Sequence, residues 1–190
     1  MTLQERPPAP GKYRLRVEDY LTLDASGAFE GARTELIAGE VIVMSPQYRP
    51  HGMVKMALYD QLREALRTIG SMLTPVVEFS LALDAHSLPE PDIMLTSEPM
   101  GEGAVPLASV ALVVEVAGPT LASDLTTKAR LYATAGIPEY WVADVEAKVI
   151  LQMWAPEGEA YAQRRVVAFG ERIEADFVAS LKITLDIPQI

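Results

Sequence analysis

Residues 110–116 read Val-Ala-Leu-Val-Val-Glu-Val, a short run that is apolar and rich in β-branched residues except at Glu115. This pattern predicts a buried strand. A carboxylate within a buried strand must be paired, hydrogen-bonded or bound to a cation. Glu115 is therefore a candidate functional residue. The alternatives are a structural salt bridge, or an edge strand on which this glutamate faces water.

A second acid stands at the start of another apolar run, Pro91-Asp92-Ile93-Met94-Leu95. Lys128 follows on a segment that is predicted to be helical. Two acids and an amine that converge on one point form a divalent-metal site for phosphoryl transfer. This pattern predicts a metal-dependent nuclease. The alternative for Asp92 is a solvated carboxylate that caps a turn.

Composition limits the kind of metal site that the chain can build. Its 190 residues, of which 49% are hydrophobic, fit one domain with a sizeable core and exclude disorder for most of the length. The chain has no cysteine and two histidines, His51 and His86. Disulfides and thiolate zinc sites are therefore excluded, and oxygen ligands favour Mg²⁺, Mn²⁺ or Ca²⁺.

The formal net charge is −10, with 26 acidic against 16 basic residues. This balance argues against tight, non-specific DNA binding by a monomer, although metal ions would neutralise acids clustered in a site. No apolar run approaches the length of a membrane span, and the N-terminus lacks an apolar signal core, so a cytoplasmic location is expected. Residues 1–12, with three prolines, are expected to form a flexible tail, and residues 13–190 a single domain.

Apolar periodicity and turn residues predict alternating helices and strands with a loop at 97–108. Glu139 is expected to cap or flank its strand. The order indicates an α/β or α+β sandwich on one central mixed sheet. The expected elements are a helix at 17–23, a hairpin at 35–44, a helix at 50–69, strands at 77–83, 89–95 and 110–116, a helix from Ser123 or Asp124 to Gly136, a strand at 139–144, and a terminal hairpin of strands 149–154 and 161–167.

Four further positions belong to the candidate site beside Lys128. Asp124, Lys128 and Tyr132 follow one another at i, i+4 and i+8, which places them on one stripe of a helix. An ordinary surface ion pair beside a tyrosine is the alternative explanation. Glu35 could extend the acidic cluster or be a charge at the edge of a hairpin. His51 belongs to the first turn of the long helix, where a surface or capping role is equally plausible.

Several motifs occur in a fixed order over roughly residues 35–154. They are Glu35-Leu36-Ile37-Ala38-Gly39-Glu40-Val41, the histidine at the start of the next helix, Glu90-Pro91-Asp92-Ile93, Leu112-Val113-Val114-Glu115-Val116, Ser123-Asp124, Lys128, Tyr132 and Ala135-Gly136-Ile137-Pro138-Glu139-Tyr140-Trp141. Together they resemble the Uma-type restriction endonuclease family, within the PD-(D/E)XK nuclease superfamily.

The resemblance implies a restriction-endonuclease-like core, in which helices flank a central mixed sheet. It implies that Asp92 and Glu115 are metal ligands and that Glu35 is the additional N-terminal acid. The superfamily's usual lysine, two residues after the second acid, is replaced here by Ala117. In families of this kind the lysine has moved to the following helix, which points to Lys128.

The leading hypothesis is hydrolysis of DNA phosphodiester bonds with Mg²⁺ or Mn²⁺ as cofactor. The carbonyl of Val116 would be a third oxygen ligand of the metal. Asp124 and Tyr132 would hold Lys128 in place, with His51 also beside the site. The alternative from another class is a non-catalytic or weakly active homodimer that acts as a binding or scaffold protein through the terminal hairpin. A third option is a hydrolase of smaller phosphate esters.

Overall fold

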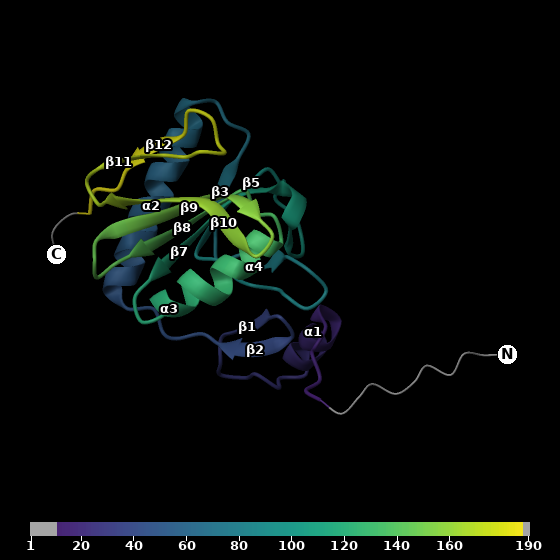
Figure 1. Ribbon diagram of the computed structural model, residues 1–190. Coiled ribbons are helices and arrows are strands. Elements are labelled where there is room, and N and C mark those ends of the chain that lie inside the picture. The colour runs from purple at the N-terminus through teal and green to yellow at the C-terminus, as the bar shows by residue number, and fades with distance from the viewer. Residues whose placement is uncertain (1–10, 188–190) are drawn as a thin grey trace.

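A mixed six-stranded sheet forms the centre of the protein, whose computed structural model describes residues 11–187 (Figure 1). The strand order is β10–β9–β8–β7–β5–β3. Neighbouring strands are antiparallel except β7 and β8, which run parallel. This arrangement confirms the predicted central mixed sheet. The strands are β3 (Thr74–Val77), β5 (Ile93–Thr96), β7 (Val110–Ala117), β8 (Glu139–Asp144), β9 (Val149–Glu157) and β10 (Ala160–Ala168).

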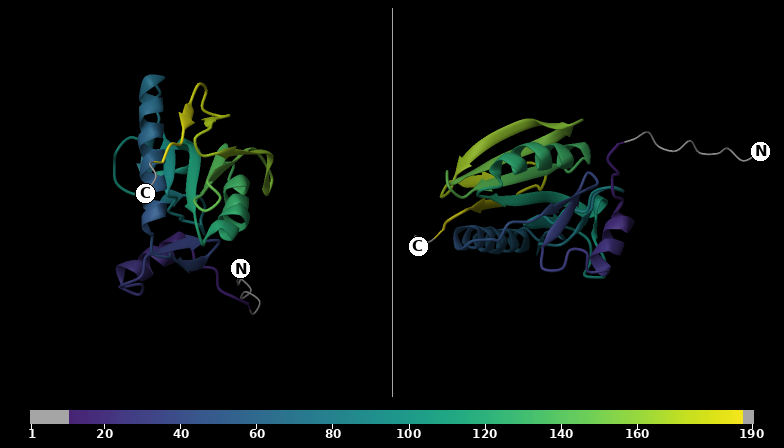
Figure 2. Two further views of the ribbon diagram at one scale, coloured as in Figure 1. Left: turned by 90° about the vertical axis from the view of Figure 1, so that its left-hand side faces the viewer. Right: turned by 90° about the horizontal axis from the view of Figure 1, so that it is seen from below.

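One face of the sheet is covered by the long helix α2 (Arg49–Thr68) (Figure 2). Pro50 stands in its first turn, where the missing N–H costs no helical hydrogen bond. Its apolar residues Val54, Leu58, Leu62 and Leu66 are buried in one core cluster with residues of β5 and β7. A small antiparallel pair that the sequence did not predict, β11 (Arg172–Glu174) and β12 (Lys182–Thr184), completes this layer.

The other face is covered by α3 (Leu121–Ser123), a π-helical turn at Asp124–Lys128, and α4 (Ala129–Thr134), which join β7 to β8. The helical segment begins earlier than predicted, because Thr120 rather than Ser123 or Asp124 is its N-cap residue. Gly136 follows the last turn with a φ of +79°, as a C-terminal glycine should. Within residues 11–187, none of the helices has the length and apolar character needed to cross a membrane.

The N-terminal part forms a separate small layer beside one end of the sheet (Figure 1). It consists of α1 (Val17–Ala25) and the hairpin of β1 (Thr34–Ile37) and β2 (Glu40–Val43). The hairpin turns at Ala38 and Gly39, as predicted. A Cβ at Gly39 would lie 2.7 Å from the Cβ of Arg14, so this turn requires glycine. The predicted flexible tail falls almost wholly outside the described residues.

The predicted strand at 77–83 is wrong, because the chain leaves the main sheet at Glu78. This residue has a φ of +57°, in the left-handed region, so β3 ends at Val77. The chain then forms the short β4 (Leu81–Ala82), which pairs in parallel with β6 (Val105–Pro106) inside the predicted loop. The alternating pattern was real, but its two halves belong to different sheets.

Glu139 is a buried anchor rather than a strand cap. Glu139 is the first residue of β8, and its side chain is fully buried. Oε1 accepts hydrogen bonds from Nε1 of Trp141 at 2.6 Å and Nε2 of Gln152 at 2.5 Å. Oε2 accepts the backbone N–H groups of Asp176 and Phe177, both at 2.9 Å. This carboxylate therefore ties the C-terminal segment to the central sheet.

Candidate active site

The register of the central sheet brings the two predicted acids together. In the antiparallel pair of β5 and β7, Ile93 lies opposite Val114. Asp92, one residue before β5, therefore lies beside Glu115 near the end of β7. Both side chains line a cleft of about 600 Å³ between the sheet, the N-terminal hairpin and the α3–α4 segment. The other predicted site residues that line it are Glu35, His51, Val116, Asp124 and Lys128.

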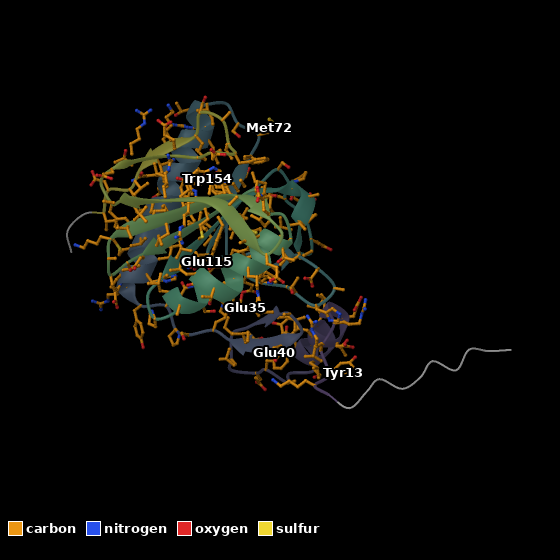
Figure 3. All side chains as sticks on the ribbon, in the orientation of Figure 1. Tyr13, Glu35, Glu40, Met72, Glu115 and Trp154 are labelled. Carbon is orange, nitrogen blue, oxygen red and sulfur yellow. The ribbon has the colours of Figure 1, made fainter. Side chains whose placement is uncertain are left out.

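Lys128 connects the acids of two different layers. Its Nζ lies 3.0 Å from Oε1 of Glu115 and 3.4 Å from Oε1 of Glu35. Glu35 comes from β1, where the hairpin meets the main body of the molecule (Figure 3). The lysine ends the π-helical turn, a feature that is frequent at functional sites. A single ammonium group thus joins the hairpin, the sheet and the helix.

The two residues expected to hold Lys128 contact other groups. The hydroxyl of Tyr132 donates to Oε1 of Glu115 at 3.0 Å, so it fixes the carboxylate that the lysine also binds. Asp124 is buried in the cleft wall, and its backbone carbonyl accepts the hydroxyl of Tyr140 at 3.1 Å. No hydrogen bond between the side chains of Asp124 and Lys128 occurs within residues 11–187. The charge of Asp124 nevertheless helps to raise the pKa of Lys128.

Asp92 is held by hydrogen bonds on both carboxylate oxygens. Oδ2 accepts the backbone N–H of Val116 at 2.8 Å. Oδ1 lies 3.1 Å from Nε2 of His51 and 3.3 Å from Nε2 of Gln47. His51 is therefore a contact of the site rather than only a helix-surface residue. Nζ of Lys55 is farther away, at 3.6 Å from Oδ1.

Three residues near Asp92 were missed in the sequence: Gln47, Lys55 and Glu78. Lys55 carried a usable signal, because it follows His51 by four residues and shares its helix face. Glu78 carried none, since its polar position matched the alternation of a half-buried strand. Its carboxylate accepts hydrogen bonds from Lys55 and Gln47 at 2.5 and 2.8 Å.

Burial and charge set the ionisation of these groups. Burial raises the pKa of Glu115, an effect that the nearby Lys128 ammonium opposes. Burial alone would lower the pKa of Lys128, but the carboxylates of Glu115, Glu35 and Asp124 outweigh it and raise that pKa. Burial likewise opposes ionisation of Asp92, yet His51 and the Val116 N–H bring its pKa below the ordinary value. The cleft thus holds Asp92 and Lys128 in their charged forms, whereas the pKa of the buried Glu115 stays above its ordinary value.

The donor atoms of the cleft fit a hard divalent cation. Within residues 11–187, no three His, Asp or Glu side chains converge into a ready-made metal cage. Mg²⁺ does not require one, because it usually keeps several waters and binds through one or two carboxylates. Oε2 of Glu115 receives no hydrogen bond from the described part of the chain, and Asp92 and Glu115 line one cleft. These carboxylates, with the Val116 carbonyl, suit Mg²⁺ or Mn²⁺.

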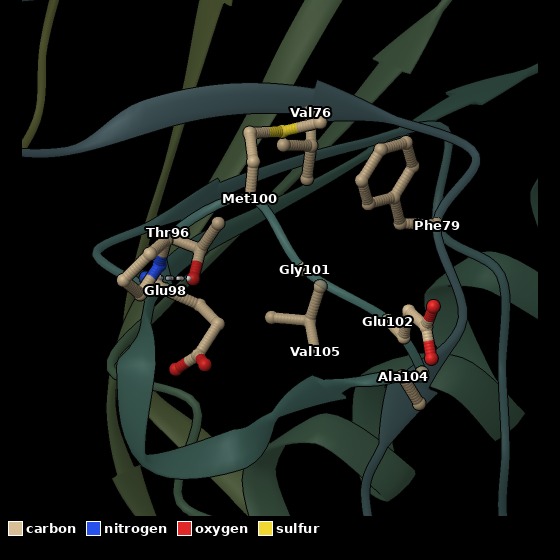
Figure 4. A pocket seen from close by; sticks show the side chains of 11 residues that line it. Val76, Phe79, Thr96, Glu98, Met100, Gly101, Glu102, Ala104 and Val105 are labelled. Atoms are coloured by element: carbon tan, nitrogen blue, oxygen red, sulfur yellow. Dashed lines mark hydrogen bonds between the residues drawn. The ribbon is translucent and has the colours of Figure 1, made fainter.

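A second cavity lies between β3 and the segment that follows β5, and Figure 4 shows its lining. It encloses about 50 Å³, which leaves room for little more than a few waters. Its lining includes Val76, Phe79 and Met100, and its charged residues are Glu98 and Glu102. This cavity offers neither the volume nor the convergent polar groups of the first.

Helices on both faces of a mixed sheet, with two acids at adjoining strand ends and a lysine beside them, define a restriction-endonuclease-like protein. The chain belongs to the Uma2 family, whose model carries the description "Putative restriction endonuclease" and matches residues 17–186.

The fold is also that of a solved structure, described as a putative nuclease belonging to DUF820 from Anabaena variabilis ATCC 29413. The two share 14% sequence identity, and their TM-score is 0.67 over 90% of this chain and 95% of that one. At this identity the likeness shows the fold alone. None of the curated proteins matches this sequence.

Proposed function

We propose that this protein is a metal-dependent nuclease that hydrolyses DNA phosphodiester bonds. The observation that carries the proposal is the convergence of Asp92, Glu115 and Lys128 in one cleft, from two strands and the following helix. Membership of the Uma2 family supports a nuclease rather than another hydrolase.

Asp92, Glu115 and the carbonyl of Val116 would hold Mg²⁺ or Mn²⁺. When bound, the ion supplies positive charge beside the phosphate and makes a water molecule more acidic. Lys128 stabilises the negative charge that develops on the phosphate during attack. Glu35 is placed to share this lysine with Glu115, and so to keep its ammonium directed into the cleft.

Supporting contacts keep the two carboxylates in place. The hydroxyl of Tyr132 fixes one oxygen of Glu115, and His51 fixes one oxygen of Asp92. Side chains that are locked in this way pay less entropy when they bind a cation and a substrate. The role of His51 in this scheme is to orient a ligand rather than to bind the metal.

The charge of the cleft bears on how DNA would bind. The lining contains one lysine and six acidic residues, which are Glu35, Glu90, Asp92, Glu115, Asp124 and Glu146. Phosphate groups approach such a surface only when cations offset its charge. We therefore expect DNA binding that is weak, dependent on divalent ions, and lost as monovalent salt is raised.

Plasmid nicking tests the proposal directly. The wild type should convert supercoiled plasmid to open circles with Mg²⁺ or Mn²⁺ and not with EDTA. Asp92→Asn keeps the shape of the side chain but removes its charge, and it should abolish cleavage. Asp60→Asn, at an exposed position on α2, is the matched control and should cleave normally. Equal cleavage by Asp92→Asn and the wild type would refute this site. An inactive wild type would favour the non-catalytic alternative.

A further inference from the structure

A third carboxylate shares the register of Asp92 and Glu115. On β3, Val77 lies opposite Ile93, which in turn lies opposite Val114. One residue beyond these three positions, in the same direction, Glu78, Asp92 and Glu115 therefore lie side by side across the sheet. The backbone N–H of Glu78 donates to the carbonyl of Asp92 at 3.3 Å. The side chain of Glu78, however, contacts Lys55 instead of lining the cleft.

Lys55 lies between two carboxylates and donates a hydrogen bond to one of them. Its Nζ is 2.5 Å from Oε1 of Glu78, but 3.6 Å from Oδ1 of Asp92. The lysine is buried, with 9% of its surface exposed, so its charge needs a partner close by. Glu78 satisfies that need. Without Glu78, Asp92 would be the remaining carboxylate among the side chains that Lys55 contacts.

The carboxylate of Glu78 is itself firmly placed. Oε1 accepts Nη1 of Arg33 at 3.0 Å and Nε2 of Gln47 at 2.8 Å, in addition to the lysine. The backbone at Glu78 has a φ of +57°, a conformation that residues with a Cβ rarely adopt. Such strain persists only where the surroundings enforce it, and it concentrates at functional sites.

We infer that Glu78 is a positioning residue of the metal site, which keeps Lys55 from hydrogen-bonding to Asp92 so that this carboxylate can bind a divalent cation. An ammonium hydrogen-bonded to Asp92 would compete for its oxygen and repel the incoming ion more strongly than one at 3.6 Å. The inference rests on the proposed function, because it takes Asp92 to be a metal ligand. It adds a residue that touches neither the metal nor the substrate.

Mn²⁺ titration by calorimetry tests the inference without relying on catalysis. Glu78→Gln should weaken Mn²⁺ binding about tenfold or more, as changes beside metal ligands commonly do. The double variant Lys55→Met/Glu78→Gln should bind Mn²⁺ about as well as the wild type, because the competing ammonium is gone. Glu64→Gln, at an exposed position on α2, is the matched control and should leave affinity unchanged.

A second substitution guards against misfolding. Glu78→Gly removes the carboxylate but suits the left-handed backbone, so it should fold readily and lose Mn²⁺ affinity as Glu78→Gln does. Wild-type affinity in both single variants would overturn the inference and leave the proposed function intact. So would a double variant as weak as Glu78→Gln. A wild type that binds no Mn²⁺ would overturn the proposed function, and this inference with it.

Discussion

The ammonium nitrogen of Lys128 lies 3.0 Å from Oε1 of Glu115, and both side chains are buried. The two residues come from different layers, since the glutamate lies on β7 and the lysine on the π-helical turn above it. Removing one member of a buried ion pair leaves an uncompensated charge, which is costly. The effect of each substitution therefore depends on which charges stay behind.

Metal binding should stabilise the folded protein. A cation that binds the native state alone raises the melting temperature by mass action. We expect Mn²⁺ to raise the melting temperature of the wild type, and Glu115→Gln to abolish the rise by removing a ligand charge. Differential scanning fluorimetry with and without Mn²⁺ measures both. Equal shifts in the two proteins would exclude Glu115 as a ligand.

Lys128→Ala should nearly abolish Mg²⁺-dependent plasmid cleavage and leave Mn²⁺ binding largely intact. The carboxylates hold the ion, whereas the ammonium acts on charge that develops during the reaction. Lys128→Arg should restore little activity, because a planar guanidinium is not a compact point charge. Lys182→Ala, on β12, is the control and should cleave normally. Full cleavage by Lys128→Ala would rule out its catalytic role.

Tyr132→Phe isolates the hydrogen bond to Glu115 from the packing of the ring. The ring of Tyr132 is buried against Tyr140, with centroids 5.0 Å apart, and phenylalanine keeps that contact. Loss of the hydroxyl should cost about 1 kcal/mol of unfolding free energy, the usual net value of one hydrogen bond. Urea denaturation followed by circular dichroism gives the difference. A cost several times larger would mean that the hydroxyl holds more than this carboxylate.

Truncation of the buried Glu139 side chain should cause a large loss of stability. Glu139→Ala would leave four hydrogen-bond donors without their acceptor, at a cost on the order of 3 kcal/mol or more. Urea denaturation should show this loss. The exposed Glu159→Ala should stay within about 0.5 kcal/mol of the wild type. A small effect at Glu139 would show that water replaces the carboxylate.

The lowered pKa of Glu78 predicts that part of the unfolding free energy is lost at acid pH. Its partial burial opposes ionisation, but hydrogen bonds from Lys55 and Arg33 lower its pKa from 4.5 to about 2. A carboxyl with a lowered folded-state pKa stabilises the fold above pH 4.5, and that stabilisation is lost as the pH falls towards 2. The wild type should therefore exceed Glu78→Gln in stability at pH 6, with a gap that closes near pH 2. A difference in stability that does not change with pH would contradict the lowered pKa of Glu78.

The strands of the central sheet other than β3 were predictable because their side chains obey simple rules. Residues 110–116 form a buried strand since apolar side chains must leave water on both faces. Glu115 was conspicuous there for the same reason, and Asp92 was marked by its place at a strand start. The order of motifs then connected both acids to Lys128.

The remaining features depend on contacts between distant segments, which no local pattern encodes. Glu78 leaves the main sheet because three side chains from elsewhere hold its carboxylate, although its sequence alternates as a strand should. Glu139 is buried because residues 176 and 177 return to it from the end of the chain. The sequence also could not show that the Tyr132 hydroxyl points to Glu115 rather than to Lys128, because a residue on that helix stripe can face either partner.

The π-helical turn at Asp124–Lys128 changes how this lysine must be sought in other genomes. Such a turn amounts to one extra residue within an α-helix, where successive residues differ by about 100° around the axis. In a relative with an unbroken α-helix, the lysine that reaches the same glutamate would stand in a different column of a sequence alignment. Conservation counted column by column would then understate this lysine, whereas superposition of structures would recover it.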